Sequence, residues 1–343
     1  MNIFDIRDLD KFISPLTPAN FAGVSVSGIC KTKNLKPNHL CLINGLTPLL
    51  EIKNFIETND SKILNDIVFI VEKKFFDKKK NEFSFIPASN TALTEHFNLV
   101  MCLISKFFYD SKYDQSQYVI DGRQTGDVKI CPSTRVSQGV FIGENVEIGS
   151  GCTIMAGCVI MGNVKIGDNT IIFPNCVIYP ESRIGDDCKL HAGVVIGSDG
   201  FGYNYMDGEH RKVWHIGGVL IGDHVEIGSN SCIDRGTFDD TVIESHCKLD
   251  NLVHIAHNCH LKTGVIVCAQ SGLAGSVTIG HFSAMSGHVA VAPGVTVGDQ
   301  CEIVGHSAVF DNVESKSRMA GMPARPMKEW LRSIAAIRRL TKK

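Results

Sequence analysis

The stretch VKICPSTRVSQGVFIGENVEIGSGCTIMAGCVIMGNVKIGDNTII (residues 128–172) carries an aliphatic residue at every sixth position. The series starts at Ile130 and runs for twelve positions, to Ile196. It resumes at Ile221 for three positions, and again at Ile243 for twelve more. So many apolar residues at one spacing predict a repeat architecture.

The position two residues before each aliphatic residue is small or β-branched, as at Val146, Cys152 and Cys158. Residues i and i−2 share one face of a strand, so both are expected to point inward. A period of six is then a short strand plus a turn, and three such units close one coil of about 18 residues. Glycines such as Gly149 follow the aliphatic residue and are expected to form tight corners. The pattern predicts a mainly β protein with a parallel β-helix.

The thirteen cysteines are explained by the same repeat. Their number is odd and no CxxC occurs, which argues against a disulfide framework or a zinc site. Seven of them occupy the small inward position, where a free cysteine serves as a small apolar residue. These are Cys152, Cys158, Cys176, Cys188, Cys247, Cys259 and Cys301.

Charge and hydropathy exclude several classes of partner. Lys and Arg number 34 against 36 Asp and Glu, so no strong field attracts nucleic acid. No apolar stretch reaches the roughly 20 residues that a membrane-spanning helix needs. The first residues, MNIFDIRDLDKF, lack the pattern of a signal peptide. We therefore expect a cytoplasmic protein without a transmembrane segment.

The period divides the chain into three parts. Residues 1–115 lack it and are expected to form an α/β domain, with strands at 24–29 and 66–72 and a helix over 90–109. Residues 116–314 are the predicted β-helix domain. Residues 315–343 form a basic helical extension, interpreted either as a capping helix or as a surface for an acidic protein partner.

The repeat is interrupted at residues 198–215 and 232–242. Solenoids often place such insertions on a binding face. The second one carries Asp234, Arg235, Asp239 and Asp240.

Three histidines follow at a spacing of three, namely His254, His257 and His260. The first and last precede inward aliphatic residues on different sides of the coil, and His257 falls on a corner. Because the three side chains diverge, no metal site is expected from them.

At these residues the sequence resembles a known family, the UDP-3-O-acylglucosamine N-acyltransferases of lipid A biosynthesis. The matching strings are GSDGFGY (197–203), IDRGTFDDT (233–241) and LDNLVHIAHN (249–258), together with Gly321, Pro323, Pro326, Lys328 and Trp330. The sibling family that acylates UDP-N-acetylglucosamine has Asp after the motif histidine and lacks the N-terminal domain. Asn258 and residues 1–115 thus favour the N-acyltransferases.

The resemblance implies a left-handed β-helix, a homotrimer and active sites between subunits. It implies transfer of an (R)-3-hydroxyacyl group from acyl carrier protein, where it is held on 4'-phosphopantetheine, to the 2-amine of UDP-3-O-acylglucosamine. The product serves the lipopolysaccharide of the outer membrane. No permanently bound cofactor is implied, and the protein is expected in the cytoplasm or peripherally at the inner membrane.

By the same resemblance His257 is the general base, a role that suits an imidazole near neutral pH. Gly275 lies 18 residues later, one full coil along, so its backbone N–H is expected beside His257 as the oxyanion donor. Asp250 and Asn251 lie one face earlier, where they either act across a subunit boundary or bind substrate. The other expected substrate contacts are Asn258, Asp239, Asp240 and, in the uridine-binding N-terminal domain, Asn44.

Two departures from the family keep alternatives open. Cys41 and Thr47 stand where the family has aromatic residues that stack on uracil, and Gly294 stands where some members have a second histidine. One alternative is an N-acyltransferase for another nucleotide amino sugar, with acyl-CoA as an alternative donor; another is the O-acyltransferase sibling. A non-catalytic trimeric scaffold and a γ-type carbonic anhydrase are weaker alternatives.

Overall fold

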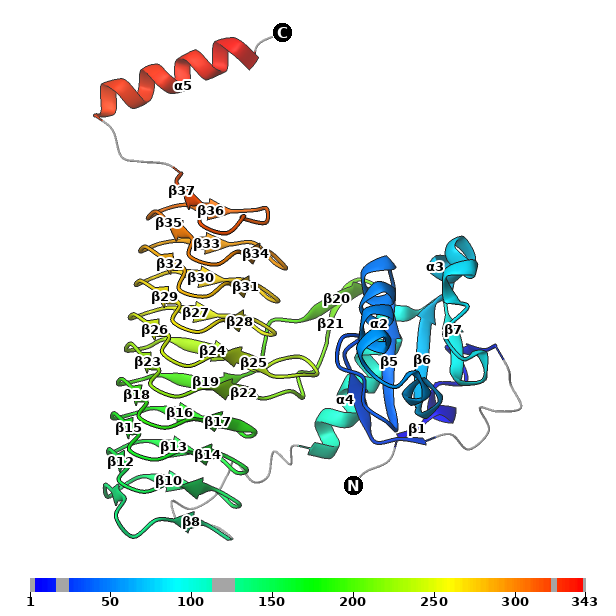
Figure 1. Cartoon of the computed structure of the whole chain (residues 1–343), viewed down its shortest axis with the longest axis horizontal. Helices are drawn as coiled ribbons and strands as arrows, with labels where there is room; N and C mark the ends of the chain where they lie inside the picture. The colour runs from blue at the N-terminus through cyan, green and yellow to red at the C-terminus, as the bar shows by residue number, and fades with distance from the viewer. Residues whose placement is uncertain (1–3, 17–24, 113–126, 322–325, 342–343) are drawn as a thin grey trace.

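The computed structural model describes residues 4–16, 25–112, 127–321 and 326–341. Figure 1 shows a tall β-helix with the N-terminal domain beside its middle coils and a helix beyond its last coil. The predicted boundary at residue 115 falls outside the described residues. The linker 113–126 and Pro323 lie outside the described residues.

The β-helix is a prism with three parallel sheets, here called sheets A, B and C in the order in which each coil visits them. Its fold is the left-handed parallel β-helix of the hexapeptide proteins. In uninterrupted coils, paired residues lie 18 positions apart, as Ile148 pairs with Ile166. Sheet A contains β8 (Lys129–Ile130), β11 (Glu147–Ile148), β14 (Lys165–Ile166), β17 (Ser182–Ile184), β22 (Val219–Ile221), β25 (Thr241–Ile243), β28 (His260–Leu261), β31 (Thr278–Ile279) and β34 (Thr296–Val297). Sheet B contains β9 (Arg135–Val136), β12 (Thr153–Ile154), β15 (Ile171–Ile172), β18 (Lys189–Leu190), β23 (Glu226–Ile227), β26 (Lys248–Leu249), β29 (Ile266–Val267), β32 (Ala284–Met285), β35 (Glu302–Ile303) and β37 (Arg318–Met319). Sheet C contains β10 (Phe141–Ile142), β13 (Val159–Ile160), β16 (Val177–Ile178), β19 (Val195–Ser198), β24 (Cys232–Asp234), β27 (His254–Ile255), β30 (Gly272–Leu273), β33 (Ala290–Val291) and β36 (Ala308–Val309).

The inward positions form one continuous apolar core, as the period predicts. The cysteines at the small inward position are buried, and their thiols donate to carbonyl groups of the next coil. Cys152 Sγ lies 2.9 Å from the Gly167 oxygen, and Cys158 Sγ lies 3.0 Å from the Phe173 oxygen. The structural interpretation of these cysteines is thus confirmed.

The corners depend on residues that tolerate unusual backbone geometry. The third residue after the aliphatic position takes a positive φ, as at Asn145 (56°) and Asn258 (60°), and Asn reaches this region more easily than most residues. A Cβ on Gly149 would approach the Gly167 carbonyl carbon of the next coil to 2.8 Å. Glycine at that place permits the close stacking of coils, as predicted.

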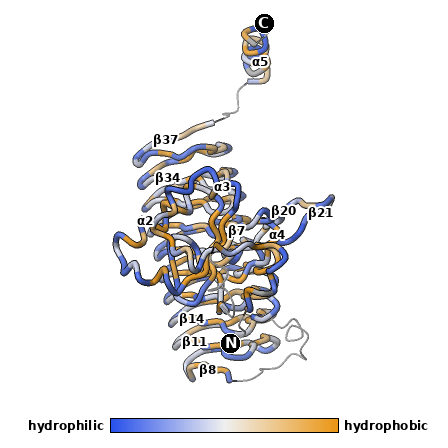
Figure 2. The backbone as a smooth tube through the Cα atoms, turned by 90° about the vertical axis from the view of Figure 1, so that its right-hand side faces the viewer, coloured by the Kyte–Doolittle hydropathy of each residue, from blue (hydrophilic) through white to orange (hydrophobic). Residues whose placement is uncertain are grey.

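The N-terminal domain is built on a five-stranded sheet in the order β2-β7-β6-β5-β4. These strands are β2 (Ser14–Pro15), β4 (Gly28–Cys30), β5 (His39–Ile43), β6 (Ile67–Glu72) and β7 (Thr91–Thr94), while β1 (Phe4–Asp5) pairs with β3 (Ser25–Val26). The helices are α2 (Leu46–Thr58), α3 (Lys73–Lys79) and α4 (Phe97–Lys112), with 3-10 turns at Ile6–Leu9, Ser61–Asp66, Lys80–Phe83 and Ala88–Asn90. In Figure 2 apolar residues concentrate in the interior of this domain, between its helices.

The predicted helix over 90–109 is wrong in its first part, because Thr91–Thr94 is strand β7. β-Branched threonines suit the sheet, and Thr94 Oγ1 accepts the His96 N–H at 2.9 Å, which caps the chain just before α4 begins.

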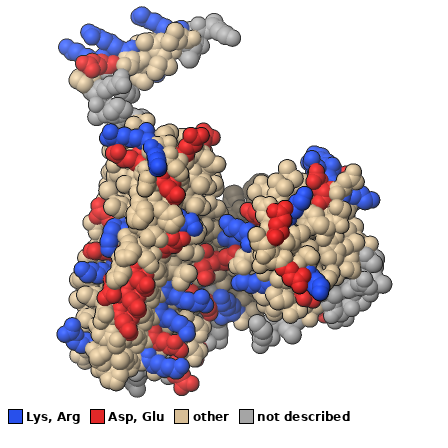
Figure 3. Space-filling model, in the orientation of Figure 1, with Lys and Arg blue, Asp and Glu red and all other residues tan. Residues whose placement is uncertain are grey.

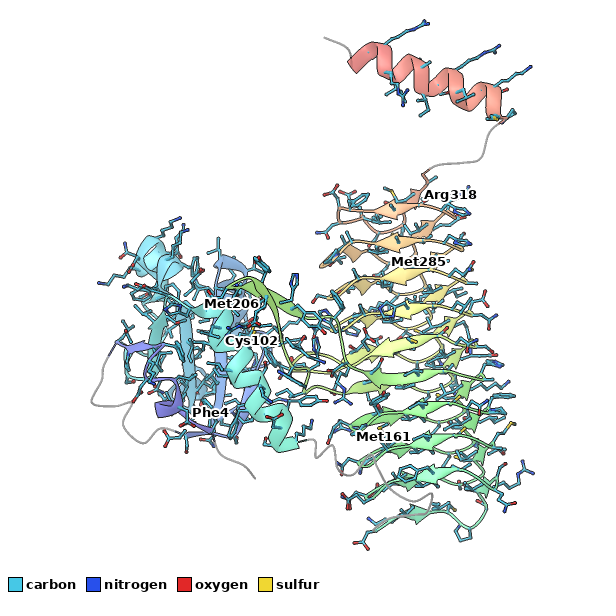
Figure 4. All side chains as sticks on the ribbon, turned by 180° about the vertical axis from the view of Figure 1, so that it is seen from behind. Phe4, Cys102, Met161, Met206, Met285 and Arg318 are labelled. Atoms are coloured by element: carbon cyan, nitrogen blue, oxygen red, sulfur yellow. The ribbon has the colours of Figure 1, made fainter. Side chains whose placement is uncertain are left out.

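The first interruption of the repeat folds as a hairpin of β20 (Tyr203–Met206) and β21 (Glu209–Lys212) that reaches the N-terminal domain. Figure 4 shows Cys102 of α4 close to Met206. Behind the hairpin, Tyr109 packs on Trp214 with ring centroids 4.5 Å apart, and Ile216 joins an apolar cluster of the N-terminal domain. The insertion therefore attaches the two domains to each other.

At the other end, β37 pairs with β35, so the β-helix extends past residue 314. The predicted C-terminal helix is α5 (Met327–Thr341). Figure 2 shows apolar and hydrophilic residues alternating along it, and Figure 3 shows its basic side chains projecting on one side. None of the described helices combines the length and the apolar character that crossing a bilayer requires.

Candidate active site

Both interruptions of the repeat leave the prism at one edge, where sheet C passes to sheet A. The first connects β19 to β22, the second connects β24 to β25, and on the next coil the corner between β27 and β28 carries His257. Both insertions and His257 therefore lie at the same edge of the prism.

Asn258 holds His257 in place. Its Oδ1 accepts the Thr237 backbone N–H at 2.8 Å, so its Nδ2 points to His257 Nδ1, also at 2.8 Å, and to Thr237 Oγ1. An amide NH₂ can only donate, so Nδ1 accepts and the neutral ring carries its proton on Nε2. Burial lowers the pKa of His257, and the Lys31 charge lowers it further. At neutral pH the imidazole is therefore uncharged.

Gly275 lies against the free edge of the His257 ring, as expected. A Cβ on Gly275 would stand 2.6 Å from Cε1 and 2.7 Å from Nε2 of that ring. No protein acceptor in the described part of the chain takes the Gly275 N–H. A backbone donor is thus available beside the imidazole.

An apolar cavity of about 580 Å³ opens in front of this pair. It is lined by His257, Gly275 and Ser276, and by Phe201, Ala256, Ala274, Pro293 and Gly294. Phe201, which is 85% exposed, forms part of the rim. The small residues leave room for an acyl chain.

A second cavity of about 540 Å³ lies on the Asn258 side, between the β-helix and the loop that follows β4. Its lining includes Lys31, Lys33, Lys36, Lys112 and Arg183, opposed by Glu181, Asp239 and Asp240. Burial lowers the pKa of Lys31 and raises the pKa of Asp239. Asp239 Oδ1 is buried and has no hydrogen-bond partner in the described residues. The excess of cations suits an anionic ligand.

Three predicted residues, Asp250, Asn251 and Asn44, lie away from His257. Asp250 and Asn251 lie at the edge between sheets B and C, where Asp250 Oδ2 accepts the Ala269 N–H and Asn251 Oδ1 accepts the Ser229 N–H. They border a third cavity with Lys248. Asn44 is exposed at the end of β5, outside these cavities.

Cys41 is fully buried in the core of the N-terminal domain and offers no surface to a ligand, and Thr47 is exposed.

The histidines diverge, as predicted. His254 approaches Asp234 at 3.6 Å, and His260 pairs with Glu244 at 2.8 Å, while His257 faces Gly275. The described residues contain no cluster of three or more side chains able to hold a metal ion.

Sequence reasoning missed His215, whose ring contacts His257 at a centroid distance of 4.9 Å. Its position inside the first interruption was the only signal.

Comparison with known proteins finds the same hexapeptide repeat. Residues 145–172 and 163–198 match the model for the bacterial transferase hexapeptide (six repeats). The UDP-3-O-acylglucosamine N-acyltransferase of Wolinella succinogenes is 45% identical over 164 residues, 48% of this chain and 52% of that protein. That of Rickettsia akari is 40% identical over 159 residues, 46% of each chain.

Among solved structures, the UDP-N-acetylglucosamine acyltransferase of Campylobacter jejuni is 22% identical, with a TM-score of 0.40 over 63% of this chain and 85% of that one. The chain spans about half the length of the curated relatives that it matches. Over that half it resembles hexapeptide-repeat acyltransferases. More narrowly, the relatives from Wolinella succinogenes and Rickettsia akari are both UDP-3-O-acylglucosamine N-acyltransferases.

Proposed function

We propose that this protein is an N-acyltransferase that moves an (R)-3-hydroxyacyl group from acyl carrier protein to the 2-amine of UDP-3-O-acylglucosamine, a step of lipid A biosynthesis. The observation that carries the proposal is the His257–Gly275 pair, which opens onto an apolar cavity and adjoins a cationic one. The names of the relatives support this choice of substrate.

The two cavities fit the two substrates. The apolar cavity takes the acyl chain and its thioester. The cationic cavity takes the diphosphate of the nucleotide sugar, and the unpartnered Asp239 oxygen accepts one of its hydroxyl or N–H groups. Asp240 already accepts the Gly218 N–H at 2.8 Å and shapes the cavity wall.

In the proposed reaction the sugar amine attacks the thioester carbon, so that a C–N bond forms and the carbonyl oxygen becomes an oxyanion. The Gly275 N–H stabilises that charge. His257 takes the amine proton at Nε2 and delivers it to the thiolate of 4'-phosphopantetheine as the C–S bond breaks. The products are an amide and a free thiol, and no metal or resident cofactor is required.

Proton acceptance at Nε2 requires the resting proton of His257 to sit on Nδ1. The Asn258 amide must then turn so that Oδ1 faces Nδ1, which gives up its bond from the Thr237 N–H. Losing one such bond costs about 1 kcal/mol. Asn258 therefore acts through the base in this proposal and serves less as a direct substrate contact.

We further propose a cytoplasmic homotrimer with acyl carrier protein as its partner. The α5 helix supports the latter, since its basic residues Lys328, Arg332, Arg338 and Arg339 outnumber the one acidic residue in its described range, Glu329. Such a surface complements an acidic protein. A catalytically silent scaffold accounts neither for the available Gly275 N–H nor for the buried Asp239 Oδ1 that lacks a hydrogen-bond partner in the described residues.

The test uses purified protein with 3-hydroxyacyl carrier protein and UDP-3-O-acylglucosamine, beside His257→Ala. We expect product from the wild type and a loss of at least about a hundredfold in the variant. Parallel reactions with UDP-N-acetylglucosamine and with acyl-CoA distinguish the alternatives. Equal activity in the wild type and the variant would refute the role of His257 as the general base. The absence of product from folded wild-type protein would refute the proposed donor and acceptor.

A further inference from the structure

His215 is a buried imidazole that packs directly on the proposed base. It follows β21, is 0% exposed, and meets the His257 ring edge to face, with an interplanar angle of 66°. It lines neither of the two cavities beside His257. It therefore contacts the base from the side away from substrate.

Two glycines of the GSDGFGY string close over this pair. A Cβ on Gly200 would lie 2.7 Å from His215 Nε2 and 2.7 Å from His257 Cβ. A Cβ on Gly202 would lie 2.8 Å from His215 Cε1. The backbone can approach His215 this closely at both positions, and His257 at Gly200, only because Gly200 and Gly202 lack side chains.

The chemistry of His215 is that of a neutral ring. Neither nitrogen makes a hydrogen bond of normal geometry within the described part of the chain. Burial, with smaller contributions from His257 and Lys212, lowers the pKa of His215 to about 4, while Asp199 and a contact with the Val213 backbone oppose this shift. Lys212 and Asp199 form an ion pair with each other. A buried polar group without a hydrogen-bond partner costs about 1–3 kcal/mol of folding free energy. A histidine at this position therefore destabilises the fold, which suggests that it serves another purpose.

We propose that His215 is a positioning residue for His257, one that fixes the orientation of the base and keeps water from its inner side. The inference rests on the proposed function for its link to catalysis. Its physical content is that the His215 ring, packed on His257, contributes to the burial that lowers the pKa of His257. The charges that also lower this pKa are those of Lys31 and His254, and both residues are retained in the test.

The variants are His215→Ala and His215→Phe. Alanine admits water behind His257, so the pKa of His257 should rise toward about 6.5, and the acid limb of kcat/KM should move to higher pH. We expect kcat to fall at least about tenfold, since the ring is no longer held. Phenylalanine keeps a planar ring against His257 and keeps water out, so the limb should stay, and kcat should fall less than in the alanine variant although the larger ring must fit between the same glycines.

NMR titration of the His257 ring measures the same pKa without turnover. It separates failure of this inference from failure of the proposed function, because it needs no substrate. If the alanine variant does not fold, His215→Asn replaces it. An unchanged His257 pKa in the truncated variant, or a phenylalanine variant as impaired as alanine, would overturn the proposal.

Discussion

Asn258 decides which nitrogen of His257 carries the proton. Its amide is oriented by the Thr237 backbone, so a neutral group donates to Nδ1, and nothing in that contact stabilises an imidazolium. Burial adds to this by lowering the pKa of His257. The proposed base is thus neutral at neutral pH, and proton acceptance at its Nε2 requires a change of tautomer.

Asn258→Asp should reverse this preference. A carboxylate accepts Nδ1–H, leaves the Nε2 lone pair free, and raises the pKa of His257 by its charge. The acid limb of kcat/KM should therefore move to higher pH, while kcat above that pKa should equal or exceed the wild-type value. The measurement is a pH–rate profile of this variant, compared with that of Asn258→Ala. The alanine variant loses the contacts of Asn258 with Thr237 and with His257 Nδ1, so its kcat should be lower. A limb that stays in place in the aspartate variant would contradict this role.

At the scale of elements, the loop after β4 and the second interruption form the cationic cavity. Lys31→Ala should weaken the binding of UDP at least about tenfold, because a partly buried charge–phosphate contact is worth roughly 1.5–3 kcal/mol. Phe238 lines the same cavity and offers an aromatic ring for stacking on uracil, which Cys41 and Thr47 do not. Phe238→Leu should therefore also weaken the binding of UDP. Calorimetry with UDP measures both, and Lys165→Ala on sheet A is the control. Unchanged affinity in the Lys31 and Phe238 variants would place the nucleotide elsewhere.

Strands and helices could be predicted from the sequence where a repeating local pattern determines them. The aliphatic positions from Ile142 to Val309 are buried in the β-helix core because every coil repeats the same packing. The hairpin 203–212 follows no such rule, since its position depends on contacts with α4. His215 could not be foreseen for the same reason, whereas Gly275 could, because one coil of spacing fixes its place beside His257.

At the scale of the whole molecule, the three faces of the prism differ. The outward residues of sheet A include Lys129, Glu147, Lys165 and Arg183. Those of sheet C are mostly small or apolar; they are Phe141, Val159, Val177, Val195, Cys232, His254, Gly272, Ala290 and Ala308. The carboxylate of Asp234, at the end of β24, lies 3.6 Å from His254 on this sheet. Such a face is suited to contact between copies of the chain. His257 borders sheet C on one edge, and Asp250 borders it on the other, within the same coil.

In the proposed homotrimer, a threefold axis in front of sheet C and parallel to the prism would keep each coil at one height in all copies. It would bring the Asp250 edge of one subunit toward the His257 edge of the next, so the site would be composite. His257→Ala and Asp250→Ala should then each be impaired alone yet complement each other when co-expressed. Under random assembly, roughly one quarter of sites combine an intact His257 with an intact Asp250, so about that share of wild-type activity should return. Native mass spectrometry verifies that mixed trimers form. Mixed trimers that remain as inactive as the parents would mean that Asp250 and His257 act in one subunit, or that Asp250 has no part in the site.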